Sequence, residues 1–273
     1  MNLLIIGNGF DLAHGLKTTY SDFLTWAYKN RKKQKYSEFN FEDYLDGNVY
    51  VKELFATTSG TWIDLENNLA NIIGTLAKRN NAEQRELRLF FEHFLIPIFE
   101  NYISEAVNKT KVLPKLLSVI RAERVLSFNY SNTFERVYGF SNAEICYVNG
   151  KANSDTSRSN IVFGCDYFDL SNRELSWYSK VFQRAAKRTD KRRIDWMAFG
   201  DGYDIEIVGH SLGKTDHDLL RPFIMNEKNT TTVYYHSEKS KHDLIYNMFE
   251  MVGEKFVDSH KIEFSPISLL TKG

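Results

Sequence analysis

The sequence predicts an α/β protein in which a parallel β-sheet carries helices on both faces. Two observations favour this class. Short apolar runs recur along the chain at lengths typical of buried strands, and amphipathic helical patterns follow most of them. Parallel strands need crossover connections, so repeated strand–turn–helix units indicate right-handed crossovers and a sheet that is covered on both sides.

The apolar runs give the predicted strands, which lie at residues 2–7, 124–128, 204–209 and 231–236, with a shorter one at 144–150 and a further candidate at 160–164. Helical spacing predicts helices at residues 18–29, 131–137, 216–225 and 240–252.

The interval 31–121 does not follow this alternation. It is rich in charged and aromatic residues, and Trp62, Leu65 and Leu69 begin a long helical stripe within it. We therefore predict one domain, residues 1–273, with a helical insertion at 31–121. Residues 176–193 are predicted as one further helix, whose basic end is interpreted as a solvated face.

Composition excludes several classes of protein. The chain has 273 residues, and its 35 Lys and Arg residues balance 35 Asp and Glu residues, which disfavours a nucleic-acid partner. The two cysteines, Cys146 and Cys165, cannot form a disulfide framework and indicate a reduced, cytoplasmic protein. No secretion signal is recognised, and no apolar run reaches the ~20 residues of a membrane span.

A glycine turn follows the first predicted strand. The stretch LLIIGNGFDLAHGL places Gly7, Asn8 and Gly9 there, with Gly15 six residues later. Glycines allow the backbone to turn sharply and to approach a ligand closely, and a helix that begins there aims N–H groups at a phosphate or sugar. The spacing departs from the dinucleotide fingerprint G-x-G-x-x-G, so a tight connection without a ligand stays an alternative.

Two polar residues follow this turn. Asp11 either caps the helix or accepts hydrogen bonds from ribose hydroxyls, because its carboxylate would repel a phosphate. His14 either lines the turn or is simply packed or exposed.

Polar side chains also follow the other predicted strands, at the sheet edge where open parallel sheets bind ligands. Asn129 could hold a ribose hydroxyl or orient a water, since its amide both donates and accepts. Asn149 follows the next strand. His210, a candidate general base, and Ser211 follow a further one, and Asp216 stands at a helix start. Their joint placement predicts a site at this edge.

The segment GHSLG, with Ser211 at its centre, fits the G-x-S-x-G elbow of serine hydrolases. However, bulky polar residues follow the serine, and no His-Gly-Gly-type oxyanion segment precedes it. Asp258 and His260 are available as the acid and the histidine that must come later, but they lie only two residues apart, so Asp243 or Asp218 would have to pair with His260. We therefore interpret His210 and Ser211 as a strand tip that faces a nucleotide.

Together, six motifs resemble the AbiH family of bacterial abortive-infection proteins, which are associated with defence against bacteriophage. They run from residue 3 to about residue 235 and are, in order, LLIIGNGFDLAHGL, WIDLE, VLSFNYSNTFE, IVFG, VFQRAAKR and IVGHSLGKTDHD. The resemblance implies a Rossmann-like core similar to the sirtuin-like domains of other phage-defence effectors, which cleave NAD+.

In that wider group a glycine loop binds the dinucleotide, and an Asn and the His of a His-Gly pair serve the chemistry. Gly7 and Gly9 match the loop, and Asn129 matches the Asn. Asn149 stands where the His is expected, and Asp11 stands where the loop usually has a small hydroxyl residue. Asn cannot act as a base, so the resemblance implies that His210 takes this part or that the reaction differs.

The leading hypothesis is an antiphage effector that binds NAD+ as its substrate and cleaves the glycosidic bond without a metal. The predicted catalytic residues are Asn129, His210 and Asp216, and the predicted nucleotide-binding residues are Gly7, Asn8, Gly9, Asp11, His14, Asn149 and Ser211.

Two alternatives belong to other classes. One is a metal-dependent nuclease or phosphohydrolase that uses Asp11, Asp64, Glu66 and Asp216, although the two central acids do not share a helix face. The other is a non-catalytic nucleotide sensor that controls a partner protein. We further expect a homo-oligomer, with a partner protein or phage component as its trigger.

Overall fold

In the computed structural model the chain divides into two units, each built from separate segments of sequence. Unit 1 comprises Met1–Leu16, Lys111–Gly150 and Arg188–Gly273, and unit 2 comprises Lys17–Thr110 and Lys151–Lys187. The structure describes residues 1–30, 35–36, 39–40, 47–56, 62–113, 115–116, 121–139, 142–152, 159–165, 172–198, 200–259 and 262–271.

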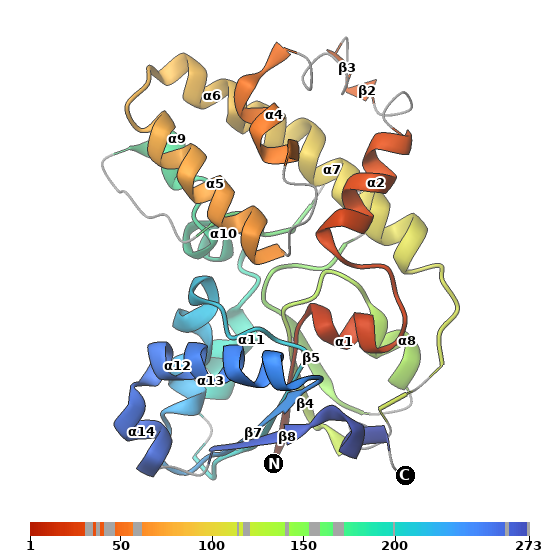
Figure 1. Ribbon diagram of the computed structural model, residues 1–273, viewed down its shortest axis with the longest axis vertical. Helices are drawn as coiled ribbons and strands as arrows, with labels where there is room; N and C mark the ends of the chain where they lie inside the picture. Colours follow the sequence, from red (N-terminus) through yellow and green to blue (C-terminus); the bar gives the residue numbers. More distant parts are fainter. Residues whose placement is uncertain are drawn as a thin grey trace. The chain divides into compact units, whose positions relative to one another are not determined.

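Unit 1 contains a six-stranded sheet in which every pair of neighbouring strands is parallel (Figure 1). The strands are β1 (Asn2–Ile6), β4 (Arg124–Ser127), β5 (Glu144–Tyr147), β6 (Asp204–Val208), β7 (Thr230–Tyr235) and β8 (Ile262–Pro266). Their spatial order is β5-β4-β1-β6-β7-β8. Counted along the chain this is 3-2-1-4-5-6, the order of the Rossmann fold. The predicted α/β, Rossmann-like class is confirmed.

Side chains of successive strand residues point to opposite faces, so each strand contributes to two cores. Leu3 and Ile5 of β1 belong to one core, and Leu4 and Ile6 belong to the other. The first core is closed by residues of α11 (Lys191–Met197), α12 (His217–Ile224) and α13 (Glu238–Val252), and the second by residues of α1 (Asn8–Ala13) and α8 (Thr133–Tyr138). Helices therefore cover both faces, as predicted.

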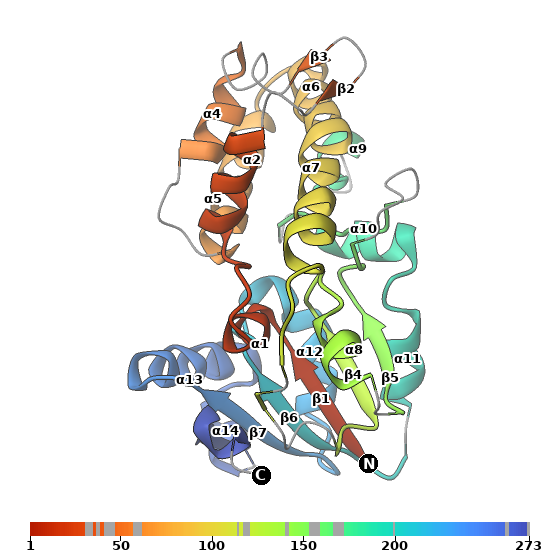
Figure 2. The same cartoon turned by 90° about the vertical axis from the view of Figure 1, so that its right-hand side faces the viewer.

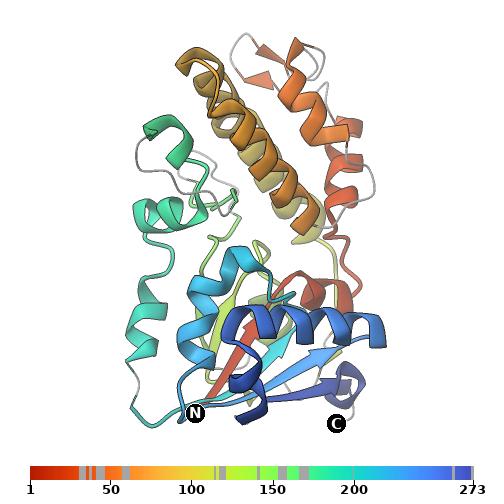
Figure 3. The same ribbon diagram turned by 60° about the vertical axis from the view of Figure 1, so that its left-hand side comes forward.

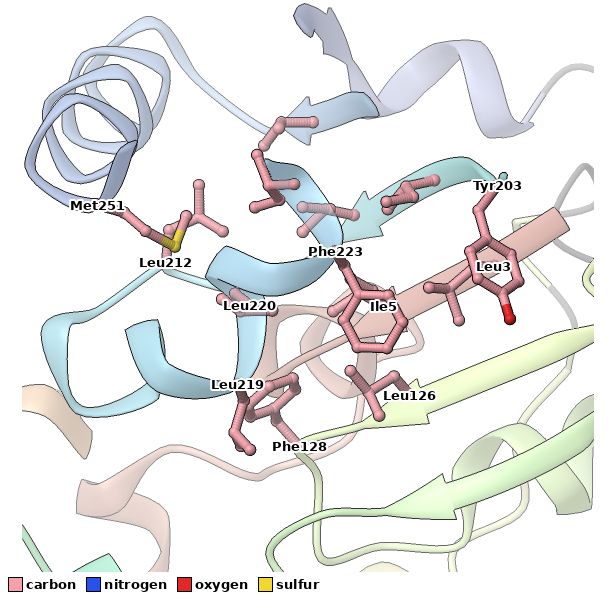
Figure 4. Packing of buried hydrophobic residues seen from close by; sticks show 14 of the residues in the cluster. Leu3, Ile5, Leu126, Phe128, Tyr203, Leu212, Leu219, Leu220, Phe223 and Met251 are labelled. Carbon is pink, nitrogen blue, oxygen red and sulfur yellow. The ribbon is translucent and has the colours of Figure 1, made fainter. Parts of the chain in front are cut away.

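The packing of α12 on the sheet is visible at close range. Leu219 and Phe223 of this helix point toward Phe128, Ile5 and Leu126 of the strand layer (Figure 4). Both α12 and α13 lie in front of the strands in Figure 3. The remaining elements of unit 1 are the 3₁₀ turns η6 (Lys214–Asp216) and η7 (Ile267–Thr271) and the short helix α14 (Glu254–Ser259).

Unit 2 is mainly helical. Its helices are α2 (Tyr20–Asn30), α4 (Val49–Ala56), α5 (Trp62–Leu76), α6 (Asn81–Phe90), α7 (Ile96–Asn101), α9 (Arg173–Ser176) and α10 (Lys180–Lys187), and its strands are β2 (Lys35–Tyr36) and β3 (Phe39–Asn40). Two π-helical segments, η2 (Phe91–Leu95) and η3 (Tyr102–Val107), follow α6 and α7 and make residues 81–107 one continuous helix. Glu66 of α5 forms a 2.5 Å ion pair with the buried Lys180 of α10.

Two predicted elements differ from the structure, and one strand of the structure was not predicted. Residues 160–164 are not a strand: Phe163 is buried, but its N–H and C=O bond to the Gln183 side chain, at 3.1 and 2.8 Å, instead of to a neighbouring strand. Residues 176–193 are not one helix, because the chain leaves α10 at Arg188, where φ is 54°, before α11 begins. Strand β8 was missed, because it is an edge strand without a continuous apolar run.

No helix in the described part of the chain is long and apolar enough to cross a membrane. Cys146 and Cys165 are both buried and unbridged, which fits the absence of a disulfide framework.

We expect Leu220→Ala to lower the free energy of unfolding by about 2–5 kcal/mol, because Leu220 is 0% exposed between α12 and the sheet. Leu269→Ala is the matched control, since Leu269 is 50% exposed, and its effect should stay below about 0.5 kcal/mol. Urea unfolding measures both. Equal effects of the two substitutions would contradict the description of this core.

Candidate functional site

The carboxyl ends of β4, β1 and β6 lie side by side (Figure 2). Phe128 N–H donates to Ile6 O at 2.9 Å, and Gly7 N–H donates to Val208 O at 3.2 Å, so strand pairing continues to the end of β1. The strand order reverses at β1, and open α/β sheets bind ligands beyond the strand ends at such a reversal. The segments after these three strands therefore form the candidate site.

Two glycine turns pack directly against each other at this edge. Gly9 N–H donates to Gly209 O at 2.8 Å, and Gly209 has a φ of 67°, which favours glycine. A Cβ on Gly7 would lie 2.7 Å from His210 Cα, and a Cβ on Gly9 would lie 2.7 Å from Gly209 Cα. These distances leave no room for a side chain. Both glycines are therefore required by the close approach of the turn after β6. The sequence had suggested instead that they are required by the close approach of a ligand.

Asp11 is the buried acid of the site, with 2% of its surface exposed. It lies inside α1, and Gly7 occupies the N-cap, so the capping alternative is wrong. Asp11 Oδ2 accepts a hydrogen bond from Ser131 Oγ at 2.5 Å, and Ser131 Oγ lies 2.9 Å from Thr133 Oγ1. Asp11 Oδ1 makes no hydrogen bond with any residue that the structure describes.

Burial raises the pKa of Asp11 to about 6, from an ordinary value of 3.8. The hydroxyls of Ser131 and Thr133 and the guanidinium of Arg136 lower the pKa, but less than burial raises it. Burial also lowers the pKa of Arg136, and Asp11 partly restores it. The Asp11 carboxyl group therefore changes charge close to neutral pH, as groups at functional sites often do.

Asn129 brings a buried donor to this acid. Its side chain is 5% exposed, and its backbone N–H donates to Ser127 Oγ at 3.2 Å, which fixes the turn after β4. The amide faces the Asp11 carboxyl group as a weak hydrogen-bond donor, which lowers the pKa of Asp11, although the contact does not reach the length and angle of a full hydrogen bond. Within the described ranges Asn129 Nδ2 has no other hydrogen-bond partner. A ligand hydroxyl could satisfy both groups, because it can donate to Asp11 and accept from Asn129.

Tyr147, at the end of β5, and Asn149, which follows this strand, border the cluster. Tyr147 is half-buried, and burial, followed by the charges of Glu135 and Asp11, raises its pKa. Asn149, which is 3% exposed, donates from Nδ2 to Phe128 O at 3.4 Å. Asn149 therefore supports the end of β4, which is a structural role.

His210 and Asp216 form a second buried pair beyond β6. His210 Nδ1 accepts a hydrogen bond from Leu212 N–H at 2.9 Å, so the neutral imidazole carries its proton on Nε2. Nε2 lies 3.6 Å from Asp216 Oδ2, and the Phe128 ring packs edge-on against the imidazole. The only nitrogen able to accept a proton is thus engaged with the backbone. This geometry makes His210 a donor, and the predicted role as general base does not fit it.

Ser211 does not have the geometry of a nucleophile elbow. The side chain of Ser211 is exposed. In the turn that contains Ser211, the residues with positive φ are Gly209 and Leu212. The turn η6 separates the serine from α12, whereas an elbow leads straight from strand to helix. Ser211 O accepts a hydrogen bond from Asn247 Nδ2 at 2.8 Å. His260, which a hydrolase would need, lies outside the described residues.

His14 is a packed residue of the core beside α1. Its Nδ1 lies 2.7 Å from Phe10 O, and its Nε2 lies 2.7 Å from the hydroxyl of Tyr138. Burial lowers its pKa. Both ring nitrogens have protein partners, so His14 is not placed to bind a nucleotide. Asn8 is the first residue of α1 and is half-buried.

The acidic cluster of the nuclease alternative is not assembled as a metal site in the described part of the chain. No group of three or more His, Cys, Asp or Glu residues is placed there to hold a metal ion. Glu66 is paired with Lys180 at 2.5 Å. The side chain of Asp64 lies outside the described residues.

The sequence analysis did not assign Ser131, Thr133, Arg136 or Tyr147 to the site. Asn132 occupies the N-cap of α8 but makes no side-chain capping hydrogen bond, while the Ser131 hydroxyl donates to Asp11. One signal was present: a Ser-x-Thr pair and an arginine follow the strand within ten residues, in SNTFER.

The contact between the two turns gives the first of four predictions about the site. Gly9→Ala should lower the free energy of unfolding by about 1–3 kcal/mol, because its Cβ would meet the Gly209 backbone. Gly74→Ala is the control, since a Cβ there meets nothing within 4 Å, and it should raise stability by about 0.5–1 kcal/mol. Denaturant unfolding compares the two, and a neutral Gly9→Ala would contradict the turn contact.

The buried acid gives a second prediction. The pKa of Asp11 is raised in the folded protein, so its contribution to stability is full below about pH 4 and is lost as the pH rises through about 6. Asp11→Asn should therefore raise the free energy of unfolding at pH 7.5 by up to about 3 kcal/mol and change it little at pH 4. Asp201→Asn, at an exposed position, is the control, and it should change the free energy of unfolding by less than about 0.5 kcal/mol. An Asp11→Asn variant that is less stable at pH 7.5 would contradict the raised pKa.

Comparison with known proteins identifies the family of this chain. A comparison with curated proteins gives no match. The family model described as "Bacteriophage abortive infection AbiH" matches residues 3–236, which is most of the chain and includes Asp11, Asn129 and His210. The chain belongs to the AbiH family of bacteriophage abortive infection proteins.

Proposed function

We propose that the protein brings about abortive infection by cleaving the N-glycosidic bond of a nucleotide, with NAD+ as the leading substrate. The observation that supports this proposal is the buried pair Asp11 and Asn129. An unsatisfied carboxylate oxygen and an unsatisfied amide donor, judged over the described residues, stand together at the ends of β1 and β4. In most proteins buried polar groups have partners, so a pair without them is explained well by a ligand.

The carboxylate suits the chemistry of glycosidic cleavage. As the bond from ribose C1′ to the base nitrogen breaks, the base leaves with the electron pair and the sugar gains the positive charge of an oxocarbenium-like state. A negative charge at Asp11 stabilises that state. Water then adds to C1′ and releases one proton to solvent, so NAD+ and water yield ADP-ribose, nicotinamide and a proton.

The surrounding residues position this acid. The Ser131 hydroxyl holds Oδ2 at 2.5 Å, which leaves Oδ1 to face the substrate. Asn129 holds a ribose hydroxyl or the attacking water through its amide. Burial keeps the local dielectric low, so the charge of Asp11 acts strongly on the developing cation. Both atoms are shielded in this structure, so a substrate reaches them only when neighbouring side chains move.

The third prediction removes the amide. Asn129→Leu keeps the shape of the side chain but deletes the buried donor, so NAD+ consumption should fall about 10²-fold or more. The melting temperature should stay unchanged or rise, because an unsatisfied buried group is removed. The measurement pairs a thermal melt with NAD+ and nicotinamide levels in phage-infected cells that express each variant.

Asn142→Leu is the control for this experiment, because Asn142 is exposed, and it should leave consumption unchanged. A wild-type protein that protects cells without consuming NAD+ would refute the glycohydrolase proposal. In that case, binding of ADP-ribose without turnover would favour the sensor, and activity lost on chelation would favour the nuclease.

The fourth prediction concerns pH. The proposed mechanism needs Asp11 ionised, so kcat/KM for NAD+ should rise as the pH passes through about 6 and should level off above about 7. Asp11→Asn should leave a low rate without this rise. A wild-type rate that falls between pH 5.5 and 7 would contradict the role of the carboxylate.

A further inference from the structure

The glycine turn after β1 has almost no N–H group left for a phosphate. Gly7 N–H donates to Val208 O at 3.2 Å, Gly9 N–H to Gly209 O at 2.8 Å, and Phe10 N–H to Gly7 O at 2.9 Å. Loops that bind a pyrophosphate present these groups to the ligand instead. The helix that follows, α1, has six residues, so its dipole is short as well.

The space above this turn is also taken. The positions where a Cβ would stand on Gly7 and Gly9 lie within 3 Å of backbone atoms of Gly209 and His210. In a dinucleotide fold the absent side chains make room for the pyrophosphate. Here they make room for the turn after β6.

The charge at this position is wrong for a phosphate. Asp11 is 2% exposed and lies in the first turns of α1, where an approaching phosphate would meet a carboxylate that is ionised above about pH 6. Arg136 interacts electrostatically with this carboxylate, and the interaction raises the pKa of its guanidinium group. The positive charge of Arg136 is therefore already partly balanced by Asp11.

The same residues do suit a sugar. Asp11 Oδ1 is an acceptor and Asn129 Nδ2 is a donor. The amide faces the carboxyl group closely enough to lower its pKa, but within the described ranges neither atom makes a hydrogen bond of full length and angle. Two adjacent hydroxyls of a ribose can donate to the first and accept from the second. Both side chains are more than nine-tenths buried, so the pair is held in place before a ligand binds.

We infer that this site recognises its substrate through the ribose diol, with no pyrophosphate contact at the glycine turn, and that it accepts ribonucleosides with a cationic leaving base as well as dinucleotides. The inference rests on the proposed function and specifies its substrate class. In that case the phosphates of a dinucleotide contribute little to the affinity for the substrate, whereas the ribose 2′-hydroxyl contributes much.

Turnover provides the first test. The purified protein, activated with infected-cell extract if needed, is given nicotinamide riboside, NAD+ and the 2′-deoxy analogue of nicotinamide riboside. We expect kcat/KM for the first two to agree within about 10-fold, and the deoxy analogue to be at least about 10²-fold worse, since a site built for a hydroxyl rejects a ligand without it. A preference for NAD+ of 10²-fold or more would overturn the inference while leaving the proposed glycohydrolase intact.

Calorimetry provides a second test that does not depend on turnover. Adenosine, ADP-ribose and inorganic pyrophosphate are titrated into wild type and into Asn129→Leu. The inference expects adenosine and ADP-ribose to bind within about 10-fold of each other, pyrophosphate not to bind, and Asn129→Leu to weaken both nucleoside ligands equally. If no substrate is cleaved, the proposed function fails, and this binding pattern alone supports the inference. Binding of ADP-ribose without adenosine, binding of pyrophosphate, or no binding at all overturns it.

Discussion

The site depends on one steric constraint, the contact between the turn after β1 and the turn after β6. Both turns lack side chains where they meet, so Gly9 N–H reaches Gly209 O at 2.8 Å. This contact fixes the direction in which α1 leaves the sheet. That direction brings Asp11 to Ser131, on the segment that follows β4. The position of the acid is therefore a consequence of glycine packing between the ends of two neighbouring strands, β1 and β6.

The stability of the surrounding sheet allows an unfavourable group at its edge. The two cores bury the side chains of β1 almost completely on both faces, and such burial contributes about 1.5–3 kcal/mol for each large apolar side chain. Against this, a carboxylate with one unsatisfied oxygen costs free energy at neutral pH. Functional sites are often destabilising in this way, and the packing of the rest of the protein offsets the loss of free energy.

The sequence predicted the parallel sheet because buried strands such as residues 2–7 and 204–209 are short runs rich in Leu, Ile and Val. It missed β8 because an edge strand needs no such run, and it mistook residues 160–164 for a strand because a glutamine side chain can satisfy a buried backbone. The sequence predicted that polar residues after the strands would gather at one sheet edge, and the structure places Asp11 beside Ser131 there. The partners of Asp11 could not be predicted, because Ser131 is 120 residues away and its hydroxyl suited a cap equally well. The protonated nitrogen of His210 likewise depends on a main-chain contact that no pattern records.

The central place of β1 has a consequence for synthesis. This strand leaves the ribosome long before its two neighbours, which lie at Arg124–Ser127 and Asp204–Val208. At usual rates of translation the apolar segment LLII therefore waits about 10–40 s before its second edge can pair. During that time it is an unpaired, aggregation-prone apolar strand in a nascent chain. Its sheet closes late, over long sequence separations, so the protein should fold slowly and rely on chaperones while the insertion between β1 and β4 is being made.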